Sequence, residues 1–183
     1  MVSKKAMMIG PMRAFCRMAG KRKFSEKDIR GMKKTAALNA ADRNPYSWNM
    51  EFLPYADKAF AAIKKKGYLA IIITNQAGIA KNLYKPDDAK KLHGYIDSLL
   101  CKEHSVIADG YYFCPHHPEA VLEEYRTVCA CRKPAPGLIL QAVSDFAAKG
   151  IEIDLSNSFT VGNRRSDLLA GINAGTKYNV LIG

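Results

Sequence analysis

The chain has 183 residues and a mass of 20.2 kDa, with 48% hydrophobic and 25% charged residues. This composition is ordinary for one globular domain that is long enough to bury a core. It contains no run of about 18 apolar residues and no short apolar core followed by a small-residue cleavage site, so we expect neither a membrane span nor a secretory signal. The sequence predicts a soluble, cytoplasmic protein.

The net charge of +11 is concentrated at the N-terminus. Residues 1–34 carry eleven Lys and Arg against Glu26 and Asp28, whereas the other 149 residues carry 17 basic and 15 acidic side chains. We interpret residues 1–34 as a poorly ordered basic arm in front of a near-neutral domain over residues 35–183. An organelle transit peptide and a contact with nucleic acid are the alternatives. No groove-binding helix pattern accompanies the charge, which argues against nucleic acid.

Helices and strands are predicted to alternate along the rest of the chain. Apolar residues at helical spacing predict a helix over residues 51–66, and the continuous apolar run 68–74 predicts a strand buried on both faces. The later elements are helices over 85–103, 137–149 and 166–174, and strands over 107–115, 158–163 and 177–183. This alternation predicts an α/β domain with a parallel sheet and helices on both faces. Ligands of such sheets bind beyond the carboxyl ends of the strands.

The loop after the second of these strands holds three of the five cysteines and two of the four histidines. Cys114-x-His116 and Cys129-x-Cys131 are two close pairs of ligands, and a loop of twelve residues between them allows a closed tetrahedral zinc site. Four protein ligands leave no position for water, so this zinc is predicted to be structural. His117 is an alternative to His116, and a chance cluster of free cysteines is the alternative to a metal.

Four segments resemble a known family: TNQAGIA (74–80), YYFCPHHP (111–118), VCACRKPAPG (128–137) and VGNRRSDLLAGINAGTK (161–177). They resemble the D-glycero-D-manno-heptose 1,7-bisphosphate 7-phosphatases and the related histidinol-phosphate phosphatases, in subfamily IIIA of the haloacid dehalogenase (HAD) superfamily. The resemblance covers about residues 38–182. It implies a HAD-like Rossmannoid fold without a large cap, a structural Zn²⁺ loop, a Mg²⁺ requirement, and hydrolysis of a small sugar phosphate in lipopolysaccharide biosynthesis. Apart from the resemblance, we expect a monomer that binds neither membrane nor nucleic acid.

The resemblance also assigns roles to individual residues. Its second motif matches Thr74 and Asn75, which are implied to hold the phosphoryl oxygens. Lys133 matches the lysine that balances the charges of the nucleophile and the phosphate, and Arg132 matches a contact to a substrate phosphate. The remaining matches are Arg164, as a basic substrate contact, and Asp167 with Asn163, in the magnesium region.

Two motifs depart from the family. The magnesium-binding Gly-Asp is Gly162-Asn163 here, and an amide brings no negative charge to a hard cation. The first motif, Asp-x-Asp-Gly-Thr, which supplies the nucleophile, is missing. One register places residues 33–37 over it, with Lys33 in the position of the nucleophile. A second register places Asp42 there as the candidate nucleophile.

Three explanations for the first motif remain open. In the first, the chain has lost the chemistry but kept a phosphate pocket, in which Lys33 replaces the charge of the metal. In the second, its first 34 residues come from a truncated, rearranged or misread gene. In the third, Asp42 is a displaced nucleophile. We expect weak or absent turnover in each case, because binding energy alone does not replace a nucleophile. The sequence therefore predicts a phosphatase by family, with a catalytically inactive sugar-phosphate-binding or structural homologue as the alternative.

Overall fold

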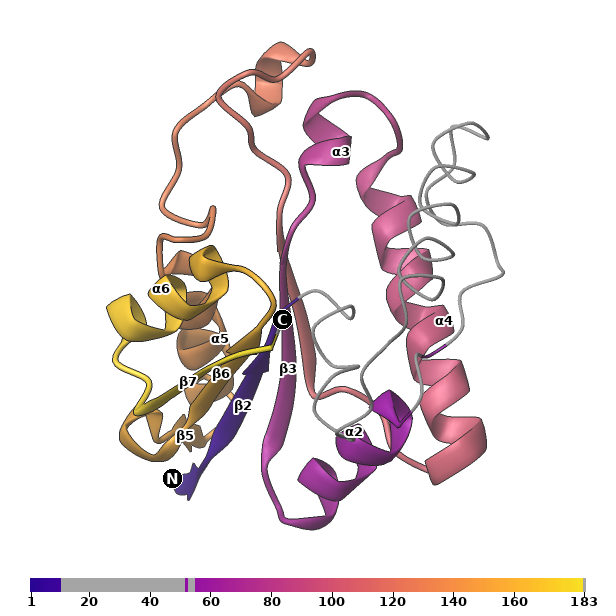
Figure 1. Cartoon of the computed structure of the whole chain (residues 1–183), viewed down its shortest axis with the longest axis vertical. Coiled ribbons are helices and arrows are strands. Elements are labelled where there is room, and N and C mark those ends of the chain that lie inside the picture. The colour runs from indigo at the N-terminus through magenta and orange to yellow at the C-terminus, as the bar shows by residue number, and fades with distance from the viewer. Residues whose placement is uncertain (11–51, 53–54, 183) are drawn as a thin grey trace.

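The computed structural model describes residues 1–10, 52 and 55–182. A five-stranded parallel sheet with the strand order β4-β3-β2-β6-β7 forms the middle layer of these residues (Figure 1). Its strands are β2 (Ala6–Ile9), β3 (Leu69–Asn75), β4 (Gly110–Cys114), β6 (Phe159–Gly162) and β7 (Tyr178–Leu181). A smaller parallel pair consists of β1 (Val2–Lys4) and β5 (Ile151–Ile153). The predicted α/β class and the parallel sheet are confirmed.

Helices cover both faces of this sheet (Figure 1). The structure describes α2 (Ala56–Lys65), α3 (Ala77–Ala80), α4 (Pro86–His104), α5 (Gly137–Ala147) and α6 (Arg165–Ala174), together with the 3-10 turns Glu123–Tyr125 and Leu155–Asn157. The helices α2 and α4 lie on one face, and α5 and α6 lie on the other. Each long helix falls within a few residues of its predicted range, because its apolar residues recur at helical spacing. In the described part of the chain, no helix has both the length and the apolar character needed to span a membrane.

The central strand of the sheet is β2, which pairs in parallel with β3 on one side and with β6 on the other. All four of its residues are buried, as expected for a short apolar run in the middle of a parallel sheet. Residues 2–9 thus form β1 and β2, although the sequence analysis placed them in a poorly ordered arm. The rest of the predicted arm, residues 11–34, lies outside the described residues.

The alternation of side chains along β2 divides the core into two layers. Met7 and Ile9 point to the face covered by α2 and α4, where they join the cluster that contains Phe60 and Leu100. Ala6 and Met8 point to the opposite face and join a cluster dominated by α5 and closed by Ala170 of α6. Because successive strand residues face opposite sides, a four-residue strand is enough to connect both layers of the core.

The strand order fixes where a ligand site can form. Along the chain the sheet grows from β2 outward through β3 and β4, then returns across β2 to add β6 and β7. The order therefore reverses at β2, and the crevice outside the carboxyl ends of β2, β3 and β6 is the place where open α/β sheets bind ligands. Gly10, Thr74 and Asn163 lie at these three strand ends.

Candidate active site

A buried ion pair occupies the carboxyl edge of the sheet. The ammonium Nζ of Lys133 lies 2.6 Å from Oδ1 of Asp167, and both side chains are almost inaccessible to solvent, at 2% and 1% exposure. The Lys133 ammonium also donates to the carbonyl oxygen of Ile73 at 2.8 Å. Burial lowers the pKa of Lys133, whereas attraction to the Asp167 carboxylate opposes this change. The structure thus places a buried cation at the end of β3.

Asp167 is also the third residue of helix α6. Its second oxygen, Oδ2, accepts a hydrogen bond from the backbone N–H of Arg164 at 3.1 Å, which satisfies one of the amides left unpaired at the helix start. Both carboxylate oxygens are therefore engaged, one by the backbone and one by Lys133. The Asp167 side chain thus pairs with Lys133 and also bonds the backbone at the start of α6.

The side chain of Asn75 joins the end of β3 to the segment that carries Lys133. Its Oδ1 accepts from the backbone N–H of Lys133 at 3.0 Å, and its Nδ2 donates to the carbonyl oxygen of the same residue at 3.1 Å. Thr74, the preceding residue, is buried at the end of β3 with 7% exposure. Thr74, Asn75 and Lys133, predicted from separate motifs, are brought together at this edge.

Gly10 directly follows the central strand and lies against Asp167. A Cβ atom built on Gly10 would lie 3.1 Å from Asp167 Oδ2 and 3.2 Å from the Cα of Gly162. Among the described residues, Gly10 thus brings no side chain between Thr74 and Asn163. Asp42, the candidate nucleophile, and Lys33 lie outside the described residues.

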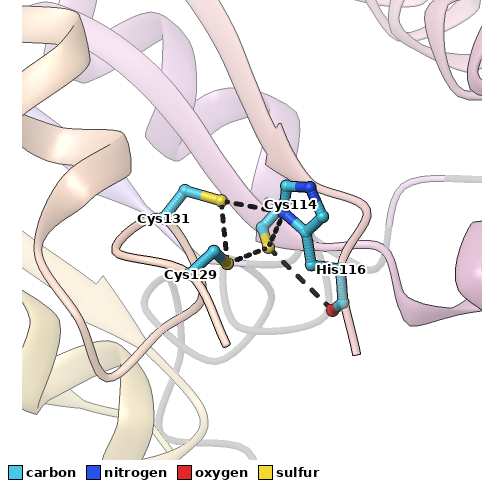
Figure 2. Close-up of side chains that lie close together, drawn as sticks. All are labelled: Cys114, His116, Cys129 and Cys131. Carbon is cyan, nitrogen blue, oxygen red and sulfur yellow. Dashed lines mark hydrogen bonds between the residues drawn. The ribbon is translucent and has the colours of Figure 1, made fainter. Parts of the chain in front are cut away.

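The predicted zinc ligands converge at one end of the cysteine loop (Figure 2). The Sγ atoms of Cys114 and Cys129 are 3.5 Å apart, and those of Cys129 and Cys131 are 3.2 Å apart. The Nδ1 atom of His116 lies 3.7 Å from Cys114 Sγ and 3.4 Å from Cys131 Sγ. A Zn–S distance of about 2.3 Å implies edges of about 3.8 Å in a regular tetrahedron. The four atoms thus have nearly the spacing of a tetrahedral zinc site.

The donor set itself also fits zinc. Three thiols and one imidazole form a Cys₃His site of the closed structural kind, and no other group of three or more His, Cys, Asp and Glu in the described ranges is close enough to hold a metal. Burial raises the pKa of the Cys114 and Cys131 thiols. Zinc binding must therefore displace protons from these thiols, because the ligand form is the thiolate. His117 is not part of the group.

The two predicted arginines occupy different surroundings. Arg132 is half-buried, and its guanidinium donates to the carbonyl oxygen of the ligand His116 at 2.9 Å. Arg164 is exposed beside the ion pair, close enough for its charge to contribute to lowering the pKa of Lys133. Arg132 thus ties the two halves of the cysteine loop together, and Arg164 adds positive charge at the rim.

The described residues do not complete a magnesium site. Asn163 is exposed, and Asp167 already pairs with Lys133 and with a backbone amide. Gly10 offers no carboxylate from the central strand. Hard cations need several oxygen ligands, with negative charge among them. We therefore derive no step of the chemistry through magnesium.

Comparisons with known proteins agree with this arrangement. The sequence profile of the polynucleotide kinase 3 phosphatase family matches residues 30–170. A D-glycero-beta-D-manno-heptose-1,7-bisphosphate 7-phosphatase from Haemophilus ducreyi is 37% identical over 134 residues, which cover 73% of this chain and 70% of the relative. The chain belongs to the heptose-bisphosphate phosphatase family. The enzyme of the same name from Escherichia coli K12 is 38% identical over 137 residues, which cover 74% of this chain and 69% of the relative.

Other relatives of this family differ in the anomer that their names specify. A Burkholderia mallei protein, 39% identical over 140 residues, is a D-glycero-alpha-D-manno-heptose-1,7-bisphosphate 7-phosphatase, and the alignment covers 75% of this chain and 71% of that protein. The names of the Haemophilus and Escherichia relatives specify the beta anomer. Membership of the family therefore leaves the anomer open.

Solved structures share the HAD-like phosphatase fold. A structure described as a HAD-like phosphatase from Mesorhizobium loti superposes with a TM-score of 0.73 at 21% identity, covering 99% of this chain and 73% of that one. The D,D-heptose 1,7-bisphosphate phosphatase from B. bronchiseptica, solved with magnesium and phosphate, gives a TM-score of 0.62 at 21% identity and covers 95% of this chain and 78% of that one. At this identity the likeness establishes the fold alone.

Two features of the site were missed from the sequence. The run Ala6–Ile9 followed by Gly10 has the length and composition of a buried strand that ends in a turn, but the charges around it favoured an arm. The contact between the Asn75 side chain and the Lys133 backbone spans 58 residues of sequence. No local pattern predicts such a contact.

Proposed function

We propose that the protein is a phosphatase that removes the 7-phosphate of D-glycero-D-manno-heptose 1,7-bisphosphate. The observation that carries this proposal is the buried Lys133 ammonium at the end of β3, beside Thr74, in a chain that belongs to this family of phosphatases. A phosphoryl group that approaches this edge meets a positive charge and a hydroxyl donor. Both stabilise negative charge on phosphoryl oxygens, most strongly where water is excluded.

The other site residues fit the same substrate. We assign Thr74 and the backbone amides that follow it to the phosphoryl oxygens, and Lys133 to the charge of the transferring group. The Arg132 guanidinium has five N–H donors, of which the structure shows one on His116, and we assign others to the remaining phosphate of the bisphosphate. Arg164 lies at the rim and is assigned to attract the anionic substrate.

Zinc holds the cysteine loop in this proposal and takes no part in the reaction. Four protein ligands close the coordination shell, so the metal has no position for water or substrate. The loop it folds ends at Arg132 and Lys133, the residues assigned to the substrate. Removing zinc is therefore expected to misplace both cations.

A second candidate function is phosphate-ester binding without hydrolysis. Gly10 favours it, because this residue follows the central strand beside Asp167 and brings no carboxylate that could attack phosphorus. The pocket would then bind the heptose bisphosphate and leave it intact. Asp42 is the candidate that would restore the chemistry.

The two functions are separated by phosphorus NMR of zinc-loaded protein with each anomer of heptose 1,7-bisphosphate, with and without Mg²⁺. A phosphatase converts the C7 resonance into inorganic phosphate and leaves the C1 phosphate in place, whereas the binding protein broadens both resonances without turnover. Asp42→Asn abolishes turnover if Asp42 is the nucleophile. Neither turnover nor broadening would reject both functions.

A cytoplasmic role in making the heptose of lipopolysaccharide follows from the proposed substrate. Reduced thiols suit this location, because a zinc-thiolate site persists where disulfides do not form.

A further inference from the structure

The turn after β3 contacts both halves of the zinc cluster. The backbone N–H of Gln76 donates to the carbonyl oxygen of Cys114, the first ligand, at 2.8 Å. The Asn75 carboxamide bonds both backbone groups of Lys133, two residues beyond Cys131, the last ligand. Asn75, the last residue of β3, and Gln76, the first residue of the turn, are thus tied to the two ends of a loop that spans residues 114–133.

We propose that Asn75 is a positioning residue whose carboxamide couples the zinc loop to the phosphate-binding turn, so that zinc and phosphate strengthen each other's binding. The inference rests on the proposed function in one respect, namely that the turn binds phosphate. Asn75 itself need not touch the substrate through its side chain. It acts by holding the backbone of Lys133.

The contacts of Lys133 show why its position depends on both partners. Its backbone is held by Asn75, and its ammonium is held by the carbonyl of Ile73 and the carboxylate of Asp167. The N–H and the C=O of Lys133 belong to the peptide groups on either side of its Cα, and the one planar Asn75 amide bonds both, so a change in φ or ψ of Lys133 disturbs these bonds. We call these two hydrogen bonds between the Asn75 carboxamide and the Lys133 backbone the clasp. They hold the segment that follows Cys131 in one orientation.

Zinc acts on the same segment from the other side. Binding the Cys131 thiolate fixes the chain two residues before Lys133, and Arg132 between them donates to the carbonyl of the ligand His116. The loop has little apolar burial of its own, since Val121 and Val128 are 67% and 91% exposed. Metal binding is therefore the main source of loop order. By linkage, any ligand that needs Lys133 in place must tighten zinc as much as zinc tightens that ligand.

Two substitutions remove the clasp to different extents. Asn75→Asp keeps an oxygen for the Lys133 N–H but loses the donor and places an oxygen against the Lys133 carbonyl. Asn75→Ala removes both bonds. The matched control is Asn173→Ala, because Asn173 is an exposed asparagine that donates to the carbonyl of Pro134, the next residue, at 3.1 Å.

The first arm of the test is hydrogen exchange of the full chain, with zinc and after its removal by a chelator, without phosphate. In the wild type, zinc removal speeds exchange of residues 74–80 and of the Lys133 amide. Asn75→Ala shows fast exchange at the Lys133 amide even with zinc, and zinc removal changes residues 74–80 much less than in the wild type, because only the Gln76–Cys114 bond remains. Asn173→Ala behaves like the wild type. The inference would be overturned if exchange of residues 74–80 in the wild type were the same with and without zinc. It would also be overturned if Asn75→Ala raised the exchange rates uniformly across β2 and β6.

The second arm measures the affinity for inorganic phosphate in both zinc states, at fixed Mg²⁺. Zinc is expected to raise phosphate affinity about tenfold in the wild type, the scale of two hydrogen bonds, and to have no effect in Asn75→Asp or Asn75→Ala. Phosphate affinity that responds to zinc equally in all variants overturns the coupling and leaves the proposed function standing. If exchange at residues 74–80 and at the Lys133 amide depends on zinc and on Asn75 as described, but no variant binds phosphate, the proposed function is rejected and the structural role of Asn75 stands.

Discussion

At the scale of single residues, the functional side chains are held by backbone groups far away in sequence. Lys133 depends on the carbonyl of Ile73, and Asn75 depends on the peptide groups of Lys133. The resemblance to the family singled out Lys133 and Asn75, each of which lies in a motif at a strand or loop end. It did not predict what they bond, since hydrogen-bond partners depend on the packed fold.

His93 is a buried residue whose titration should show in the stability of the fold. It stacks on Tyr111 with ring centroids 4.3 Å apart, and burial lowers its pKa to about 4, with Asp97 opposing the change. In the unfolded chain His93 has its ordinary pKa of 6.5. Between pH 6.5 and pH 4, His93 is therefore protonated in the unfolded chain and neutral in the folded protein. Stability from this residue is full above pH 6.5 and is lost as the pH falls toward 4, by about 2 kcal/mol at pH 5.

The substitution His93→Phe keeps a stacking ring and removes the titration. We expect the free energy of unfolding of the wild type to fall between pH 7 and pH 5 by about 2 kcal/mol more than that of the variant. Urea unfolding at both pH values measures this difference, and the comparison cancels acid effects on zinc that both proteins share. Parallel losses in the two proteins would show that His93 is not held neutral by burial.

At the scale of elements, the cysteine loop is the segment whose order depends on something other than apolar burial. Cys129→Ser removes one of four ligands, so zinc content should drop from about one per chain to near zero, and the free energy of unfolding should decrease by more than about 2 kcal/mol. Cys101→Ser is the control, because Cys101 is an exposed cysteine on α4 outside the cluster. Elemental analysis and urea unfolding test both; retention of zinc by Cys129→Ser would contradict the site.

Two helical glycines have opposite surroundings. A Cβ atom on Gly171 of α6 would collide with Thr160 and Asn179, which belong to a buried hydrogen-bonded group with Thr176, whereas a Cβ on Gly94 of α4 would meet nothing. Gly171→Ala should therefore cost about 1–3 kcal/mol, and Gly94→Ala should gain about 0.5–1 kcal/mol through its higher helix propensity. Thermal unfolding ranks the two, and equal effects would mean that α6 is not packed this closely on β6.

Helices and strands were predicted well where the apolar pattern is long, and poorly where a short apolar run lies among charged residues. The amphipathic patterns of α4 and α5 and the apolar run of β3 are long enough to define their type. The strand β2 has only four residues and is flanked by Lys4, Lys5 and a glycine. Its assignment depends on pairing with β3 and β6, which is a tertiary property.

At the scale of the whole molecule, β2 makes the two halves of the sheet one structure. It joins the layer under α2 and α4 to the layer under α5 and α6, and its end meets the site at Gly10. The α/β class followed from alternating elements alone. The sequence showed that the first motif is missing, but the position of Gly10 beside Asp167 was visible only in the fold.

The central claim is that this edge of the sheet binds the phosphate of a heptose bisphosphate through Lys133. Calorimetric titration of zinc-loaded protein with heptose 1,7-bisphosphate tests it, whether or not turnover follows. We expect binding that weakens at least tenfold in Lys133→Met and in the Lys133→Met/Asp167→Asn double variant, which leaves no unpaired buried charge, but not in Lys149→Met. Equal affinity in the wild type and the double variant, or no binding by the wild type, would contradict the claim.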